Sequence, residues 1–234
     1  IKFNGNNVGG NLSIVGNHTR RLLMGDSRVV GTTALETASS SLLTLTGCNF
    51  VGQFTISSAS AIVISGCSFS STSTTTINGS VNLSNCQVFG TLSLGGFGDQ
   101  TIESTRILGQ LLFTADASNV RWTVSHCTIV PPTETVDAIV FPVLTFPNDV
   151  LISVSGNTVL LASGLSYVPR GSCVRFQGNV RRGNICSNKF ILTGTLDPGA
   201  GVLGTFTFAC IKFEGTTSTD GVVITGNYLE RPAT

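Results

Sequence analysis

The sequence predicts an all-β chain that forms one single-stranded, right-handed parallel β-helix, a solenoid of about nine rungs. Three observations lead to this prediction. A short phrase of alternating apolar residues, followed by a polar bend and another apolar residue, recurs along the chain. Its most regular copies place Cys48, Cys67 and Cys86 at a constant spacing of 19 residues. Only 11% of the residues are charged, whereas Gly, Ser and Thr are abundant, which favours strands and turns over surface helices.

Each copy of the phrase has the pattern of a strand that ends in a bend. Leu43–Phe50 reads Leu-Thr-Leu-Thr-Gly-Cys-Asn-Phe, and Ile62–Phe69 reads Ile-Val-Ile-Ser-Gly-Cys-Ser-Phe. Alternation with period two turns every second side chain inward, and the residues after the bend begin the next strand. We therefore expect one ladder of stacked bend residues, which contains Asn17, Cys48, Cys67, Cys86, Thr105, Cys127, Asn157, Asn188 and Asn227.

A second phrase predicts another strand in several rungs. Ile1–Gly5 matches Val174–Gly178 and Ile211–Gly215, and we expect Leu111–Thr114 and Ile139–Pro142 at the corresponding place in their rungs. Between 14 and 18 residues separate this phrase from the next bend, which is room for at least two strands and a turn. Each rung is therefore predicted to contain three short strands.

The longer spacings between bends predict loops that leave the rod. They fall near residues 20–40, 131–149, 161–172 and 193–205, which contain Pro, Asp and Gly residues typical of turns. Thr33–Ala38 has the composition of a helical turn. Because a repeat architecture is one continuous unit, we predict one domain over residues 1–234. Residue 1 is Ile, and we expect a segment of a longer or oligomeric protein.

The rung pattern apolar-x-apolar-x-Gly-Asn-x-apolar, as in Ile152–Val159, resembles the pectate-lyase-like right-handed parallel β-helix superfamily. The resemblance covers nearly the whole chain, and it implies the fold rather than a chemistry. In composition the chain is most similar to viral and phage tailspike or fibre rods, and to kinetoplastid surface proteins of the dispersed-gene-family type. Members of the superfamily commonly have an Asn ladder inside one bend, whose amides bond to neighbouring rungs. The resemblance implies this role for Asn17, Asn157, Asn188 and Asn227, and a departure from it at Cys48, Cys67, Cys86 and Cys127, where small side chains would stack.

The cysteine ladder has two interpretations. Parallel rungs place equivalent Cα atoms about 4.8 Å apart, which lies within the range of a disulfide. Stacked side chains point the same way, however, and the chain has no Cys-x-x-Cys pair of the kind that binds zinc. We therefore expect buried free thiols that pack as small apolar residues, with no metal ion and no cofactor.

One outward stripe concentrates charge. Alternation turns Arg175, Gln177, Lys212 and Glu214 outward, and stacking would place Arg175 beside Lys212. The stripe either binds an acidic or sialylated glycan or is a set of solvated charges that keeps the surface soluble. The residues proposed for binding are Arg170, Arg175, Gln177, Arg181, Arg182, Lys212 and Glu214.

A catalytic role would require paired carboxylates on neighbouring rungs. The Asp residues lie in turn contexts, and residues 37–98 contain no charged residue. We therefore expect a non-enzymatic protein of the extracellular space, cell surface or virion surface, which binds a glycan or protein receptor. The alternatives are a tailspike-type lyase or glycoside hydrolase and a purely structural fibre segment.

The net charge and the hydropathy of the sequence limit the classes of partner that we expect. The net charge of +1 gives no reason to expect nucleic acid, and no apolar run approaches the length of a membrane span. A homotrimer or end-to-end stacking with another domain is consistent with a solenoid, whose end strands are otherwise unpaired. The Asn78-Gly79-Ser80 sequon would accept a glycan only in a secreted eukaryotic protein.

Overall fold

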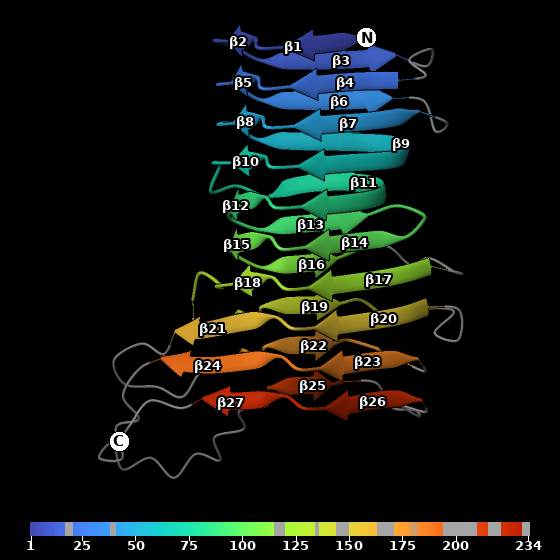
Figure 1. Ribbon diagram of the computed structural model, residues 1–234, viewed down its shortest axis with the longest axis vertical. Helices are drawn as coiled ribbons and strands as arrows, with labels where there is room; N and C mark the ends of the chain where they lie inside the picture. Colours follow the sequence, from blue (N-terminus) through green and yellow to red (C-terminus); the bar gives the residue numbers. More distant parts are fainter. Residues whose placement is uncertain are drawn as a thin grey trace.

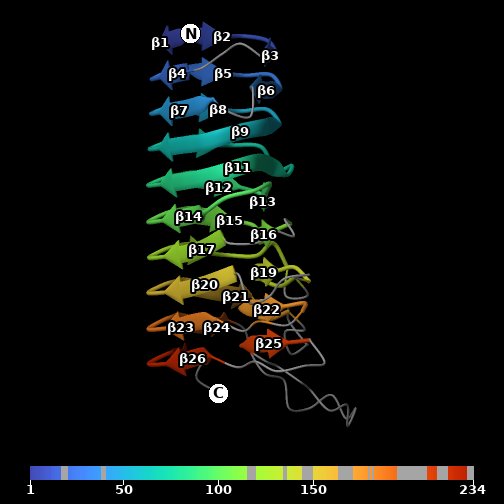
Figure 2. The same ribbon diagram turned by 90° about the vertical axis from the view of Figure 1, so that its right-hand side faces the viewer.

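The computed structural model is a tall stack of parallel strands (Figures 1 and 2). It describes residues 1–16, 21–37, 41–114, 120–133, 136–143, 150–162, 171–178, 180, 182–193, 210–214 and 221–230. Throughout these residues the chain is all β, and every strand pairing is parallel. The prediction of an all-β chain with parallel strands is therefore confirmed. The described part contains no helix that is long and apolar enough to span a membrane.

Three ladders of paired strands run along the stack, and the chain visits them in a fixed order. It passes through β1 (Lys2–Asn4) in ladder 1, β2 (Asn7–Val8) in ladder 2 and β3 (Leu12–Gly16) in ladder 3. It then returns to ladder 1 with β4 (Arg21–Gly25), which pairs with β1. One such circuit is a rung, so residues one rung apart in sequence become neighbours in space.

The strands divide among the three ladders by their pairing. Ladder 1 contains β1, β4, β7 (Leu42–Thr46), the second halves of β9 (Phe54–Ser65) and β11 (Thr75–Ser84), β14 (Gln100–Glu103), β17 (Val120–Ser125), β20 (Val150–Ser155), β23 (Gly183–Cys186) and β26 (Val222–Thr225). Ladder 2 contains β2, β5 (Arg28–Val29), β8 (Asn49–Phe50), β10 (Ser68–Phe69), β12 (Gln87–Phe89), β15 (Arg106–Leu108), β18 (Thr128–Ile129), β21 (Thr158–Ala162), β24 (Lys189–Thr193) and β27 (Tyr228–Glu230). Ladder 3 contains β3, β6 (Thr33–Thr37), the first halves of β9 and β11, β13 (Leu92–Gly95), β16 (Leu111–Phe113), β19 (Ile139–Phe141), β22 (Val174–Phe176) and β25 (Ile211–Phe213).

The region predicted as a loop near residues 20–40 is instead a complete rung. Strands β4, β5 and β6 lie there, and the helical turn expected at Thr33–Ala38 is the strand β6 over Thr33–Thr37. Leu22 and Met24 point into the core with at most 2% exposure, as alternation requires. The sequence pattern did not reveal this rung because its bend residues are unusual. Asp26 stands where most rungs have Gly or Asn, and Ser27 stands where most rungs have Cys or Asn. Ladder 2 consequently has ten strands in the described residues, one more than the predicted nine rungs.

The predicted equivalence of Ile1–Gly5 with the later Arg-Phe and Lys-Phe phrases is wrong. Strand β1 belongs to ladder 1, whereas β22 and β25 belong to ladder 3. All three ladders alternate apolar and polar residues, so a phrase of this length cannot distinguish them. The equivalence of β16, β19, β22 and β25 is confirmed, because these strands pair in succession.

A single backbone conformation repeats at every bend between ladders 1 and 2. One residue in each bend has a positive φ, between 46° and 66°. This left-handed conformation favours Gly, and Asn or Asp among the other residues, which explains the Gly or Asn that recurs in the sequence phrase. The residues in this bend position are Gly5, Asp26, Gly47, Gly66, Asn85, Ser104, His126, Gly156, Ser187 and Gly226.

The residue after each bend points inward, and together these residues form what we call the inner column. In successive rungs the backbone N–H of one member donates to the side chain of the next. Cys127 donates to Asn157 Oδ1 at 2.9 Å, and Asn157 donates to Asn188 Oδ1 at 3.0 Å. Thiol and hydroxyl groups serve in the same way, since Cys48 donates to Cys67 Sγ at 3.4 Å. The members are Asn6, Ser27, Cys48, Cys67, Cys86, Thr105, Cys127, Asn157, Asn188 and Asn227.

The inner column contains eight of the nine residues proposed from the sequence. The ninth, Asn17, lies outside the described residues, and β3 before it belongs to ladder 3 rather than ladder 1. Asn6 and Ser27 are the members that the sequence pattern missed. The thiols were expected only to stack, but the structure shows them accepting hydrogen bonds from the neighbouring rung.

Aromatic side chains fill the core beside the inner column. Phe113, Phe141, Phe176 and Phe213 stack in adjacent rungs of ladder 3, with ring centroids 4.7 to 5.0 Å apart. Trp122 from ladder 1 stacks on Phe113 at 5.1 Å. Because rungs repeat at about 4.8 Å, identical positions give offset ring stacking without any further adjustment.

The inner column provides a first testable prediction. Replacing Asn157 with Ala removes the acceptor for Cys127 N–H and the donor to Val124 O, both of which are buried. Unsatisfied buried groups of this kind cost about 1–3 kcal/mol each, so we expect a loss of about 3 kcal/mol in the free energy of unfolding. Urea denaturation measures it. Asn157→Cys should reduce the free energy of unfolding by less, because thiols occupy the equivalent position in other rungs. As a control, Asn184→Ala at an exposed position should change the free energy of unfolding by less than about 0.5 kcal/mol. Equal effects of the two Ala variants would contradict the role assigned to the column.

Candidate functional site

The charged stripe predicted from the sequence forms a compact cluster of two acids and two bases. We call Asp137, Arg175, Lys212 and Glu214 the charged cluster. Arg175 and Lys212 face each other across paired strands, as predicted. Arg175 bonds Asp137 at 2.9 Å and Glu214 at 2.7 Å, and Lys212 bonds Glu214 at 2.7 Å. The four charges cancel, so these residues do not form a basic patch.

Glu214 is held in its ionised form by the two bases of the charged cluster. The pKa of Glu214 is lowered, first by its hydrogen bond from Lys212 and then by that from Arg175. Asp137 accepts two further hydrogen bonds, from Ser172 N–H at 2.7 Å and Ser172 Oγ at 2.6 Å. The pKa of Arg175 is raised, chiefly by its hydrogen bond to Glu214. A general acid needs a raised pKa and a general base a pKa near neutrality, so neither role suits Glu214.

The other proposed binding residues contribute little to this cluster. Gln177 and Arg182 are exposed, and Arg170 and Arg181 lie outside the described residues. Among the described residues, Arg182 takes part in no ion pair, and Gln177 is uncharged. The sequence therefore located Arg175, Lys212 and Glu214 correctly but missed Asp137, which reaches Arg175 from the preceding rung of ladder 3.

The cysteines have the properties of packed thiols. No disulfide joins any two of the seven, and Cys48, Cys67, Cys86, Cys127 and Cys173 are buried. Burial raises the pKa of Cys127 to about 11. The pKa of Cys67 is raised by its contacts with the Cys48 and Cys86 thiols and by burial. The Cys67 and Cys127 thiols stay protonated near pH 7 and are therefore poor nucleophiles and poor metal ligands, whereas the hydrogen bond with Cys67 lowers the pKa of the buried Cys48 to about 7. No group of three potential metal ligands occurs in the described part of the chain.

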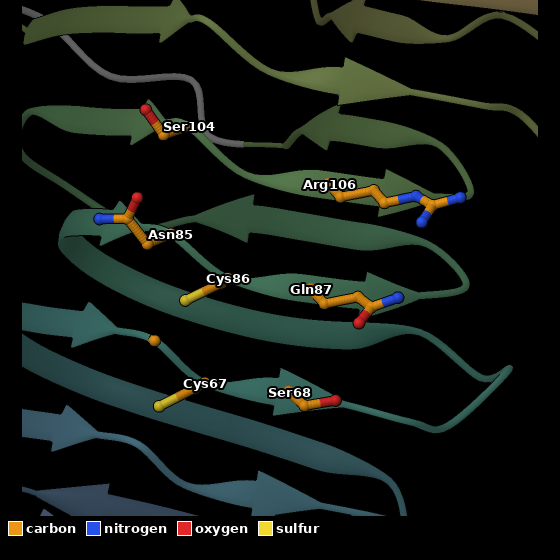
Figure 3. A pocket seen from close by; sticks show the side chains of 8 residues that line it. Cys67, Ser68, Asn85, Cys86, Gln87, Ser104 and Arg106 are labelled. Atoms are coloured by element: carbon orange, nitrogen blue, oxygen red, sulfur yellow. The ribbon is translucent and has the colours of Figure 1, made fainter.

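A polar depression lies at the bend between ladders 1 and 2, in the regular part of the rod (Figure 3). We call it the bend groove. Its volume is about 460 Å³, and its lining consists of Gly66, Cys67, Ser68, Asn85, Cys86, Gln87, Ser104 and Arg106.

Two columns of side chains border the bend groove. One consists of the positive-φ residues Gly66, Asn85 and Ser104, which directly follow the ends of ladder 1 strands. The other starts the strands of ladder 2, where Ser68 pairs with Gln87 and Gln87 pairs with Arg106. Cys67 and Cys86 lie between the two columns and are buried, so they form the floor. The groove therefore follows the axis of the stack over three rungs.

Most polar side chains of the bend groove are available to a ligand. Asn85, Ser104 and Arg106 are exposed, and Gln87 is half-buried. In the described part of the chain no side-chain hydrogen bond or ion pair is formed by Asn85, Gln87, Ser104 or Arg106. The groove thus offers amides, a hydroxyl and a guanidinium, which can recognise sugar hydroxyls and anionic groups.

The sequence contains a signal for the bend groove that the 19-residue pattern alone did not reveal. Asn49, Ser68, Gln87 and Arg106 recur at intervals of 19 residues, one position after the inner column. Arg106 and Glu103 are also among the first charges after the uncharged stretch of residues 37–98. The 19-residue register predicted which residues stack from rung to rung. It did not predict a binding site, because the regular rungs were interpreted as a spacer.

Comparisons with known proteins do not assign the chain to a family. No family model matches it, and no curated protein and no solved structure matches it.

The ion pairs of the charged cluster predict a dependence of stability on pH. Because the pKa of Glu214 is lowered by folding, its contribution is present above the ordinary carboxylate pKa of about 4.3 and is lost as the pH falls through the lower folded value. We expect Glu214→Gln to lower the urea midpoint at pH 7 but to change it much less at pH 3. The control Glu36→Gln removes an exposed acid of ladder 3 and should have little effect at pH 7. A difference for Glu214→Gln that grows on acidification would refute this assignment.

Thiol accessibility provides another test. We expect iodoacetamide at pH 8 to modify the native protein first at Cys186, which is half-buried, and to leave Cys48, Cys67, Cys86 and Cys127 unmodified over the same time. Mass spectrometry of peptides identifies the labelled positions. In denaturant all seven cysteines should react, which provides the control. Recovery of disulfide-linked peptides from the native protein would contradict the free-thiol assignment.

Proposed function

We propose that this chain is a right-handed parallel β-helix of the pectate-lyase-like type and acts as a non-enzymatic adhesion or receptor-binding rod at a cell or virion surface. Three features support the fold proposal: the three strands per rung, the side-chain ladder at one bend, and the strong preference for right-handed connections between parallel strands. The handedness and the relation to tailspikes or kinetoplastid surface proteins are parts of the proposal.

The observation that carries the functional proposal is the outward surface of ladder 1. From β7 to β20 the last two outward side chains of each strand are not buried, and among these only Glu103 is charged. At the preceding outward position β17 has the exposed Arg121 and β20 has Leu151. We call this surface the hydroxyl face; it contains Thr44, Thr46, Val63, Ser65, Asn82, Ser84, Thr101, Glu103, Thr123, Ser125, Ser153 and Ser155.

The hydroxyl face suits the recognition of a glycan. Its hydroxyl and amide groups both donate and accept hydrogen bonds, as sugar hydroxyls do. They recur at about 4.8 Å along the stack because the rungs are in register. Ser84 Oγ donates to Ser65 Oγ at 3.3 Å, so neighbouring rungs already share a polar network. A rigid core beneath the face lowers the entropic cost of binding, since few backbone groups need to be ordered.

The chemistry of the charged cluster argues against the enzymatic alternative. Glu214 is held ionised by Lys212 and Arg175, and inverting or retaining hydrolysis requires one protonated carboxyl group. A lyase needs a base, and Arg175 is kept protonated by its partners. A purely structural fibre would not need a nearly uncharged polar face, although it remains the simplest outcome if no ligand binds. Trimerisation or end-to-end stacking would raise the avidity of individually weak sites.

Binding and turnover measurements test the proposed function. We expect the protein to bind oligosaccharides with dissociation constants near 1 mM, about −4 kcal/mol per site, and to release no new reducing ends or unsaturated products. Asn82→Lys on the hydroxyl face should weaken binding about tenfold. The matched control Gln177→Lys introduces the same charge directly after a ladder 3 strand and should leave affinity unchanged. Turnover of any polysaccharide, or equal effects of the two variants, would overturn the proposal.

A further inference from the structure

The bend groove adjoins the hydroxyl face along its edge. Ser65, Ser84 and Glu103 end the strands of ladder 1, and the next residues, Gly66, Asn85 and Ser104, border the groove. A ligand that lies on the hydroxyl face can therefore extend into the groove. Any specificity for the type of sugar must come from side chains that break the uniform pattern of the face, and the groove contains them.

Arg106 is the only charged residue in the lining of the bend groove. Its neighbours in the column are neutral, because it pairs with Gln87 on one side and Thr128 on the other. The described part of the chain provides it with no ion-pair partner. An exposed guanidinium of this kind binds carboxylate or sulfate groups in a bidentate manner. This contrasts with Arg175, whose guanidinium is already occupied by two carboxylates.

The position of Glu103 gives the bound anion an orientation. This acid is exposed at the end of β14, on the ladder 1 side of the groove, and Arg106 begins β15 on the ladder 2 side. An anionic substituent would be repelled at the ladder 1 edge and attracted at the ladder 2 edge. The neutral amides of Asn85 and Gln87 lie one rung away, where they can bond ring hydroxyls of the same ligand (Figure 3).

Arg28 shows that an outward position at the start of a ladder 2 strand is not sufficient to make an arginine an anion-binding site. It stands in the same outward column of ladder 2, two rungs before Ser68. The bend residue beside it is Asp26, an acid, whereas the corresponding residue beside Arg106 is Ser104. An anion near Arg28 would meet this carboxylate. Lys189 in the same column has the neutral bend residue Ser187 but is paired with Glu230 at 2.6 Å. Among the described cations of the column, Arg106 lines the bend groove and has no ion-pair partner.

We propose that the bend groove recognises an acidic glycan, with the carboxylate or sulfate of one sugar at Arg106 and the hydroxyls of its neighbours at Asn85, Gln87 and Ser104. The inference rests on the proposed glycan-binding function and assigns it a ligand class and a specificity residue. Successive rungs offer contacts at about 4.8 Å, which suits a chain of sugars lying along the stack.

The test uses variants taken from neighbouring rungs, so that each new residue already occupies the same position in this fold. Arg106→Thr introduces the residue type found at the paired position 128. In the same way, Asn85→Gly introduces the residue type of position 66, and Gln87→Ser that of position 68. Arg28→Asn, which takes the residue of Asn49, is the control with the same change in charge. Calorimetry with a uronate oligosaccharide, a sulfated one and a neutral one provides the affinities, and urea midpoints verify the fold.

We expect Arg106→Thr to weaken binding of the acidic sugars at least about tenfold and to leave the neutral sugar within about twofold. Arg106→Lys should restore part of the loss, and added salt should weaken the acidic ligands in the wild type only. Asn85→Gly and Gln87→Ser should weaken all ligands a few-fold, while Arg28→Asn should have no effect. Binding of uronate but not sulfate, or of both, identifies the anion and supports the inference.

Two results would overturn the inference in different ways. If acidic sugars bind the wild type and Arg106→Thr equally, the groove is not the anion site, and the general glycan-binding proposal survives. If the wild type binds none of the three sugars while its fold is intact, both proposals fail together.

Discussion

The structure depends on one repeated hydrogen bond, in which the backbone N–H at the start of a ladder 2 strand meets a side chain of the next rung. This N–H lies in a tight bend between two strands and has no backbone acceptor among the described residues of the neighbouring rung, so a side chain must satisfy it. Asn157 and Asn188 satisfy it with an amide oxygen at 3.0 Å or less from the donor nitrogen, and Cys67 with sulfur at 3.4 Å. The Asn157 amide also donates to the Val124 carbonyl of the preceding rung and to Asn188 Oδ1 of the following rung, so it links three rungs.

This constraint explains why the bend is the most uniform element of the chain and why the exposed positions next to it are free to vary. The inner column accepts small side chains with an acceptor atom, and the residue before it needs a positive φ. The residue after it only has to point outward. Asn49, Ser68, Gln87, Arg106 and Lys189 can therefore occupy equivalent positions without a change in the core. A regular scaffold thus allows the chemistry of its surface to change from rung to rung.

The alternation of apolar residues and the spacing of the bends predicted a large part of the fold. They failed where different ladders have the same residue pattern or where a bend has unusual residues. Strand direction, the buried thiols and most of the inner column were predicted from the 19-residue register. The rung at residues 21–37 was missed because Asp26 and Ser27 depart from the commonest bend residues, although Asp tolerates a positive φ and Ser offers an acceptor. Ile1–Gly5 was placed in the wrong ladder because an apolar–polar–apolar triplet fits all three.

The two clusters of polar residues show why the candidate site could not be derived from charge alone. In sequence, Arg175 and Lys212 stand out as a basic stripe and Arg106 as an isolated residue. In the structure, Asp137 and Glu214 converge on Arg175, so the conspicuous charges neutralise one another. Arg106 pairs with the uncharged Gln87 and Thr128, and although Glu103 lies in the same rung, no ion pair among the described residues includes Arg106. Recognition of an anion depends on the charge left after internal pairing, and this net charge is greater at Arg106 than at the charged cluster, whose four charges cancel.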